Sequence, residues 1–197
     1  MNRVLIIACG ALAREIRALS RDLPHIDLHC LPATLHNTPD RIPAAVRAAI
    51  QAARPRYQRI FVGYADCGTG GELDRVLGDE AASRLPGPHC YAFFSGTDAF
   101  LAAGDRDMRS FFLTDFLARQ FQALVMEPLG LDRHPELRDA YFGQYETLVY
   151  LAQTDDEALN RAAIQAADTL RLRFERRHVG YGDLAAAIAA LDPTSPG

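Results

Sequence analysis

Two cysteines stand where an apolar run of the sequence gives way to a glycine turn. Cys9 follows residues 3–8 (RVLIIA) and Cys67 follows residues 60–64 (IFVGY), and each thiol directly precedes a glycine. Such continuous apolar runs are typical of strands buried on both faces. Ligands of open α/β sheets bind beyond the carboxyl ends of the strands. We therefore expect Cys9 and Cys67 to share one site, which Cys90, beside a further apolar run, is expected to join.

Three kinds of role are open to these thiols. Thiolates of Cys9, Cys67 and Cys90 could hold a zinc ion or three irons of an iron–sulfur cluster, leaving one position for substrate. Alternatively, Cys9 and Cys67 could transfer protons in a cofactor-independent racemase or isomerase, in which Cys90 has no role. Buried cysteines can also act as small apolar side chains, which is our interpretation of Cys30 within an expected strand.

Polar residues near the thiols extend the predicted site. Asp66 precedes Cys67 and could either orient a group at the site or fix the turn through an Asx-type hydrogen bond. His36, in a loop after an expected strand, could be a metal ligand or a proton-transfer group, or it could cap the loop or lie in solvent. A helix start follows Cys67, so we expect this thiol to ionise more readily than a free cysteine.

A glycine-rich turn after Cys67 could hold the anionic group of a small acidic substrate. The backbone N–H groups that could cradle a phosphate or carboxylate belong to Gly68, Thr69, Gly70 and Gly71. The turn has neither the G-x-G-x-x-G order nor a Walker lysine, so a plain tight turn is the alternative.

The elements that must position these residues alternate between strand and helix. Runs with strand or helix character are expected as strands at 26–31, 91–94, 145–152 and 172–178, and as helices at 11–22, 42–53, 72–78, 95–104, 116–126, 131–140, 157–167 and 184–191. Their order predicts an α/β fold with a Rossmann-like parallel sheet flanked by helices. We expect one domain over residues 1–191 or two small α/β lobes divided within 95–115, followed by a disordered tail at 192–197.

Composition excludes several classes of function. All 21 basic residues are arginine, which excludes a Schiff-base lysine and a P-loop lysine within this chain. The net charge of −4 argues against a nucleic-acid partner. No apolar run reaches the length that crosses a bilayer, so we expect no membrane partner and a cytoplasmic protein, in which four cysteines are not a disulfide framework.

Six blocks of sequence together resemble a known family. In chain order they are IIACGALAREI, LPATLHNTP, VGYADCGTGG, LPGPHCYAFFSG, FFLTDFLARQF and LVYLAQTDD. They are similar to the bacterial and archaeal domain-of-unknown-function family 1638, over about residues 3–180. The blocks include Cys9, His36, Cys67 and Cys90, which favours the three-cysteine site.

The resemblance implies an association with corrinoid-dependent methyl transfer and one-carbon metabolism. We therefore expect a metal- or iron–sulfur-binding enzyme or accessory factor whose partner is a corrinoid protein or a methyltransferase. The thiol racemase or isomerase is the alternative, and a non-enzymatic module that docks on a methyltransferase is a third. Homo-oligomer formation is left open.

Overall fold

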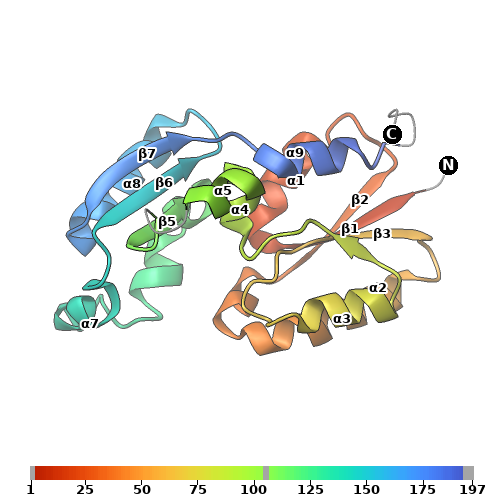
Figure 1. Ribbon diagram of the computed structural model, residues 1–197, viewed down its shortest axis with the longest axis horizontal. Coiled ribbons are helices and arrows are strands. Elements are labelled where there is room, and N and C mark those ends of the chain that lie inside the picture. The colour runs from red at the N-terminus through yellow and green to blue at the C-terminus, as the bar shows by residue number, and fades with distance from the viewer. Residues whose placement is uncertain (1–2, 104–106, 193–197) are drawn as a thin grey trace. The chain divides into compact units, whose positions relative to one another are not determined.

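The chain folds into two compact units, each built on a parallel sheet. The structure is a computed structural model that describes residues 3–103 and 107–192. The first unit contains the residues up to Phe93 and those from Tyr181 onward, and the second contains Phe94–Gly180. Figure 1 shows the strands and helices of each unit. Parallel sheets flanked by helices confirm the predicted α/β class, and the extent of a single domain over 1–191 stays a prediction.

The sheet of the first unit has the strand order β2-β1-β3-β4, with every neighbouring pair parallel. Its strands are β1 (Val4–Cys9), β2 (Ile26–Leu31), β3 (Arg59–Gly63) and β4 (Ser83–Arg84). All six residues of β1 are buried because this strand is central, whereas the edge strand β2 is partly exposed. The strand at 26–31 was predicted to the residue, and the short β4 carried no sequence signal.

Over residues 3–103 and 107–192, four helices of the first unit follow its strands in alternation, the last of them ending in the first two residues of the second unit, and a fifth comes from the C-terminal segment. They are α1 (Ala13–Leu19), α2 (Ile42–Ala53), α3 (Glu72–Asp79), α4 (Cys90–Ser95) and α9 (Gly182–Ala189). The expected strand at 91–94 is wrong, because these residues belong to α4. A short apolar run does not distinguish a buried strand from a buried helical turn, and here the run is a helix whose Ala92, Phe93 and Phe94 are buried.

The second unit contains a three-stranded parallel sheet in the order β5-β6-β7. Its strands are β5 (Ser110–Thr114), β6 (Thr147–Ala152) and β7 (Arg173–His178), and its helices are α5 (Thr97–Ala103), α6 (Asp115–Arg119), α7 (Arg138–Phe142) and α8 (Glu157–Leu170). The helix expected at 116–126 breaks after α6 into a π-helical turn, Gln122–Met126. The helix expected at 131–140 begins later, as a 3₁₀ turn at Pro135–Leu137 that leads into α7.

The core of the second unit forms around the central strand β6, five of whose six residues are buried. Asp156 caps α8 by accepting hydrogen bonds from the N–H groups of Ala158 (2.8 Å) and Leu159 (3.3 Å). Of the tail expected at 192–197, residues 193–197 lie outside the described residues, as does the expected helix end at Gly104. Among the described residues, no helix has the length and apolarity that crossing a membrane requires.

Candidate thiol and imidazole site

Cys9 lies at the carboxyl end of the central strand β1. Strand β3 pairs with β1 in a register that aligns Ala8 with Gly63, so Cys9 and Tyr64 follow at the same level of neighbouring strands. The Cys9 sulfur accepts a hydrogen bond from the N–H of Ala11 at 3.4 Å and thereby caps the 3₁₀ turn that begins at Gly10. The thiol is thus fixed at the sheet edge where ligands of such folds bind.

His36 reaches the same edge from the 3₁₀ turn Ala33–Asn37, which follows β2. Its Nδ1 lies 3.5 Å from the Cys9 sulfur, within hydrogen-bonding distance for a thiol. The imidazole is half-buried and stacks on the ring of Tyr64, with ring centroids 6.4 Å apart and planes inclined by 18°. The structure therefore brings together two predicted residues, Cys9 and His36, as a thiol–imidazole pair.

Cys67 is buried and has left-handed backbone geometry, with a φ of 51°. Only glycine adopts this region routinely, so the surrounding turn must hold Cys67 in place. Asp66 does so: its carboxylate accepts hydrogen bonds from the Thr69 hydroxyl (2.8 Å) and from the N–H groups of Gly71 (2.9 Å) and Gly70 (3.2 Å). Of the two roles considered for Asp66, the structure shows the Asx-type turn.

The glycine turn therefore uses its donors within the chain. Two of the N–H groups expected to cradle a substrate anion, those of Gly70 and Gly71, already bind the carboxylate of Asp66. A substrate carboxylate or phosphate would have to displace the carboxylate of Asp66, which belongs to the same turn and therefore always lies close to these N–H groups. The turn therefore fixes the position of Cys67.

A second loop brings Cys90 to the same region. The N–H groups of Asp66 and Cys67 donate to the carbonyls of Gly87 (3.0 Å) and Pro88 (2.9 Å). This pairing places the start of α4, with Cys90 as its first residue, beside the Cys67 turn. The N–H of Cys90 is close enough to the Cys67 sulfur to favour the thiolate form of Cys67.

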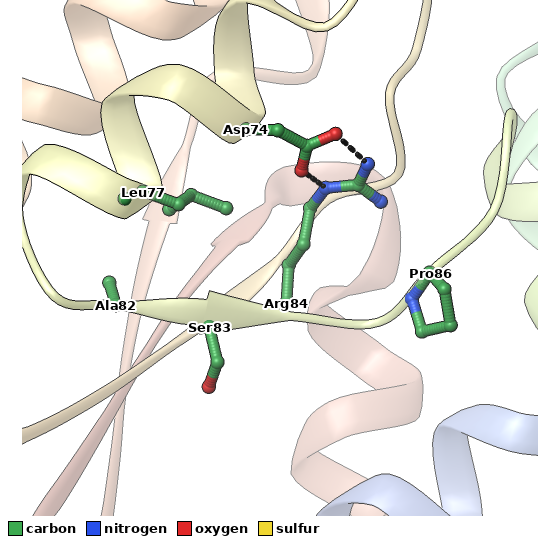
Figure 2. A pocket seen from close by; sticks show the side chains of 7 residues that line it. Asp74, Leu77, Ala82, Ser83, Arg84 and Pro86 are labelled. Atoms are coloured by element: carbon green, nitrogen blue, oxygen red, sulfur yellow. Dashed lines mark hydrogen bonds and ion pairs between the residues drawn. The ribbon is translucent and has the colours of Figure 1, made fainter.

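Arg84 anchors that loop from the edge strand β4. Its guanidinium forms a two-pronged ion pair with Asp74, at 2.7 and 2.8 Å, and also donates to the carbonyls of Leu85 (2.6 Å) and Gly87 (3.5 Å). Arg84 and Asp74 border a pocket of about 400 Å³ beside β4 (Figure 2). Because the Arg84 guanidinium is already paired, it is not available as a cation to a ligand in this pocket, and it instead positions the loop behind Cys67.

Burial keeps the thiols protonated. It raises the pKa of Cys9 to about 12 and that of Cys67 to about 11, and it also raises the pKa of Cys90. The nearby Cys67 sulfur raises the pKa of Cys9 further, while the Ala11 N–H and the proximity of the Tyr64 hydroxyl lower it. The expectation that Cys67 ionises easily is thus wrong, because desolvation outweighs the neighbouring N–H groups.

The imidazole of His36 is also neutral. Burial lowers its pKa, whereas the backbone at Ala33 raises it by a smaller amount. A neutral ring nitrogen beside a neutral thiol can accept the thiol proton. In the resting state of the pair, the proton is therefore on the sulfur of Cys9 and His36 is neutral.

The structure gathers the three thiols more loosely than a metal centre requires. Their sulfurs influence one another electrostatically, so Cys9, Cys67 and Cys90 belong to one region of the first unit. Within the part of the chain that the structure describes, however, no group of three or more His, Cys, Asp or Glu side chains is arranged to hold a metal ion. Cys30, interpreted as a buried apolar side chain, is instead exposed because β2 is an edge strand.

Tyr64 is the member of the site that the sequence prediction missed. It was assigned only to an apolar strand, yet its side chain lies beside both Cys9 and His36 in the arrangement described above. The residue is 1% exposed, and its hydroxyl has no hydrogen-bond partner among the described residues. A tyrosine at the end of a strand, two residues before Asp66, was the available signal.

Fold and site together define an α/β protein with a buried cluster of thiols, an imidazole and a phenol at the carboxyl edge of one sheet. The chain belongs to the family described as Protein of unknown function (DUF1638), whose model matches residues 30–188. His36, Cys67 and Cys90 fall within the matched range, and Cys9 precedes it. No match was found among curated proteins or among solved structures.

Proposed function

We propose that the protein is a cofactor-independent thiol enzyme that moves a proton at a carbon atom of a small substrate. The observation that carries this proposal is the 3.5 Å contact between the Cys9 sulfur and His36 Nδ1 at the ligand-binding edge of the sheet. A thiol with a base at this distance is the arrangement of an activated sulfur. Cys67 is the second thiol of the site.

The proton inventory of this reaction balances: one turnover leaves an added proton on His36 and a thiolate at Cys67, and proton exchange with water returns both to their starting states. His36 takes the proton of Cys9 and leaves a thiolate, which removes a proton from the substrate carbon. Cys67, protonated at rest, donates its own proton to the resulting carbanion. One proton leaves the carbon and one returns, as in a racemisation or an isomerisation.

The charges of the site favour an uncharged substrate. At neutral pH, Cys9, Cys67 and Tyr64 keep their protons and His36 lacks its second one. The ionised neighbours of Cys67 are the carboxylate of Asp66, which repels an anion, and the guanidinium of Arg84, whose charge is already paired with Asp74. We therefore propose a neutral carbon acid, such as an amide, ester or ketone, in place of the small acidic substrate expected from the glycine turn.

Isotope exchange tests this proposal, because uptake of deuterium reports removal of a carbon-bound proton whatever product is formed. The protein is incubated in D₂O with a panel of small amides, esters and ketones, and wash-in of deuterium at carbon is followed by NMR. We expect exchange with at least one compound, loss of exchange in Cys9→Ser and in His36→Asn, and retention in Cys30→Ser, whose thiol is exposed on β2. Absence of exchange throughout the panel, or exchange that survives Cys9→Ser, would refute the proposal.

A metal–thiolate centre is the second candidate, favoured by the mutual electrostatic influence of the three sulfurs. Cys9, Cys67 and Cys90 would be the ligands of zinc or of an iron–sulfur cluster, both of which prefer thiolate sulfur. The arrangement of the described side chains does not fit such a centre, so no reaction step is assigned to it. Anaerobic purification followed by metal and sulfide analysis tests it, and bound metal lost in the triple Cys→Ser variant would support it.

We also propose an association with corrinoid-dependent methyl transfer and one-carbon metabolism, and a cytoplasmic location. It rests on the family resemblance. Co-purification from native extract with a corrinoid protein or a methyltransferase would support the association. Failure to co-purify with any methyltransferase component would count against it and against a purely docking role.

A further inference from the structure

The Tyr64 hydroxyl is a buried polar group whose surroundings leave it without an ordinary partner. Its residue is 1% exposed, and no described group forms a hydrogen bond with the hydroxyl. Buried hydroxyls are normally paired, because an unpaired one loses its hydrogen bonds to water without replacement. The Tyr64 hydroxyl is thus one of the few buried polar groups of the described residues whose lack of a partner needs an explanation.

The position of Tyr64, beside Cys9 and His36, offers an explanation. The register of β1 and β3 places Tyr64 level with Cys9, and paired residues of neighbouring parallel strands direct their side chains to the same face. The His36 ring, whose Nδ1 lies 3.5 Å from the Cys9 sulfur, stacks on the Tyr64 ring. The Tyr64 hydroxyl lies close enough to the Cys9 sulfur to lower the pKa of Cys9, and the sulfur in turn raises the pKa of Tyr64, although the two groups fall outside ordinary hydrogen-bond geometry. Tyr64 thus lies beside the sulfur that has a base next to it.

We propose that Tyr64 is a positioning residue whose hydroxyl donates a hydrogen bond to the Cys9 thiolate at the moment when His36 removes the thiol proton. Together with the Ala11 N–H, which lies 3.4 Å from the same sulfur, it gives the thiolate two donors. A neutral thiol is a weak acceptor, which explains why the hydroxyl is unpaired while Cys9 holds its proton. Hydrogen bonds to a charged acceptor are about twice as strong as those between neutral groups.

The same geometry distinguishes Cys9 from Cys67. The Cys9 sulfur has an adjacent base, a backbone donor and a phenol donor. Cys67 has backbone donors and no adjacent base, and the carboxylate of Asp66, which opposes its ionisation, outweighs the charge of Arg84, which favours it. Cys9 is therefore the thiol that forms the thiolate first, and Cys67 is the thiol that starts protonated. The order of the two proton transfers rests on the proposed function. The hydrogen bond from Tyr64 does not, because it requires only that Cys9 become a thiolate.

The test is the pH dependence of Cys9 modification by methyl methanethiosulfonate, a small reagent, with the modified residue located by mass spectrometry. The titratable groups that act on Cys9 are Cys67, Cys90, Tyr64, Cys30 and the adjacent His36. We expect Tyr64→Phe to slow Cys9 modification about tenfold at a fixed pH below the midpoint, which corresponds to a midpoint raised by about one pH unit. Cys30 modification serves as an internal reference.

Tyr57→Phe is the matched control. It removes another tyrosine hydroxyl of the first unit, one that donates a hydrogen bond to Asp27 at 2.8 Å. It should leave the Cys9 profile unchanged. Tyr64→Phe should also keep or raise the melting temperature, since it removes a buried unpaired hydroxyl and no packing. An unchanged Cys9 profile, or a melting temperature that falls, overturns the inference, because the hydroxyl would then be idle or structural.

Failure of this inference and failure of the proposed function give different results. If Tyr64→Phe shifts the Cys9 profile but Cys9→Ser leaves deuterium exchange intact, Tyr64 stabilises the thiolate and the proposed reaction is wrong. If exchange depends on Cys9 and His36 but Tyr64→Phe leaves the Cys9 profile unchanged, the reaction stands and the role of Tyr64 is wrong.

Discussion

Replacement of Asp66 by alanine should destabilise the turn that carries Cys67. The substitution removes three hydrogen bonds to the carboxylate, from Thr69, Gly70 and Gly71. Because this carboxylate is near the surface, we assign each bond the net value of an ordinary hydrogen bond, about 1 kcal/mol, instead of the larger value of a buried charged one, for a total of about 3 kcal/mol in the free energy of unfolding. The turn must also keep Cys67 at a positive φ, so its amides should exchange faster with solvent in the variant.

Urea unfolding measured at pH 7 provides the free energy, and amide exchange at Gly70 and Gly71 localises the effect. Asp79→Ala is the control, because the side chain of Asp79 is 62% exposed and its ion pair with Arg47 should contribute less than about 1 kcal/mol. A loss in Asp66→Ala no larger than that of the control, or unchanged protection at Gly70 and Gly71, would refute the reasoning.

The effect of Asp66 should also depend on pH in a defined direction. Burial raises the pKa of its carboxyl, but the hydrogen bonds from Gly71, Thr69 and Gly70 together lower it below the ordinary 3.8. A lowered folded-state pKa means that the stabilisation is complete above the ordinary value and is lost as the pH falls through the folded value. The difference between wild type and Asp66→Ala should therefore persist from pH 7 to pH 5 and shrink in stronger acid.

Three further outcomes are expected. Arg171→Gly should raise the free energy of unfolding by about 1 kcal/mol in a urea titration, because Arg171 ends α8 at a φ of 54° that glycine adopts freely; an unchanged or lower value contradicts this. Gly63→Ala should lower the free energy of unfolding by about 1–3 kcal/mol, since its Cβ would lie 2.9 Å from that of Ala8; wild-type stability would show that the strands can separate. Cys67 should react with thiol reagents with a midpoint near pH 11, far above that of a free thiol, and a midpoint at or below 9 would show that burial does not control it.

The sequence by itself determined the parallel α/β architecture of the first unit. Strand β2 and helix α2 match their predicted bounds, because alternating apolar runs and amphipathic stretches are local signals. The chain order also predicted that Cys9 and Cys67 follow strands that end at the same edge. The α4 region could not be assigned correctly in this way, because its apolar run is too short to show a period.

Only the tertiary structure decided what the candidate residues contact. The donors of the glycine turn bind Asp66, although the sequence allowed an external anion equally well. Burial raises the pKa of Cys67 where the helix start alone predicted a lower value, because desolvation depends on every neighbour in space and not on adjacent residues. The pairing of His36 with Cys9, and the place of Tyr64 beside them, follow from strand register, which a local pattern does not encode.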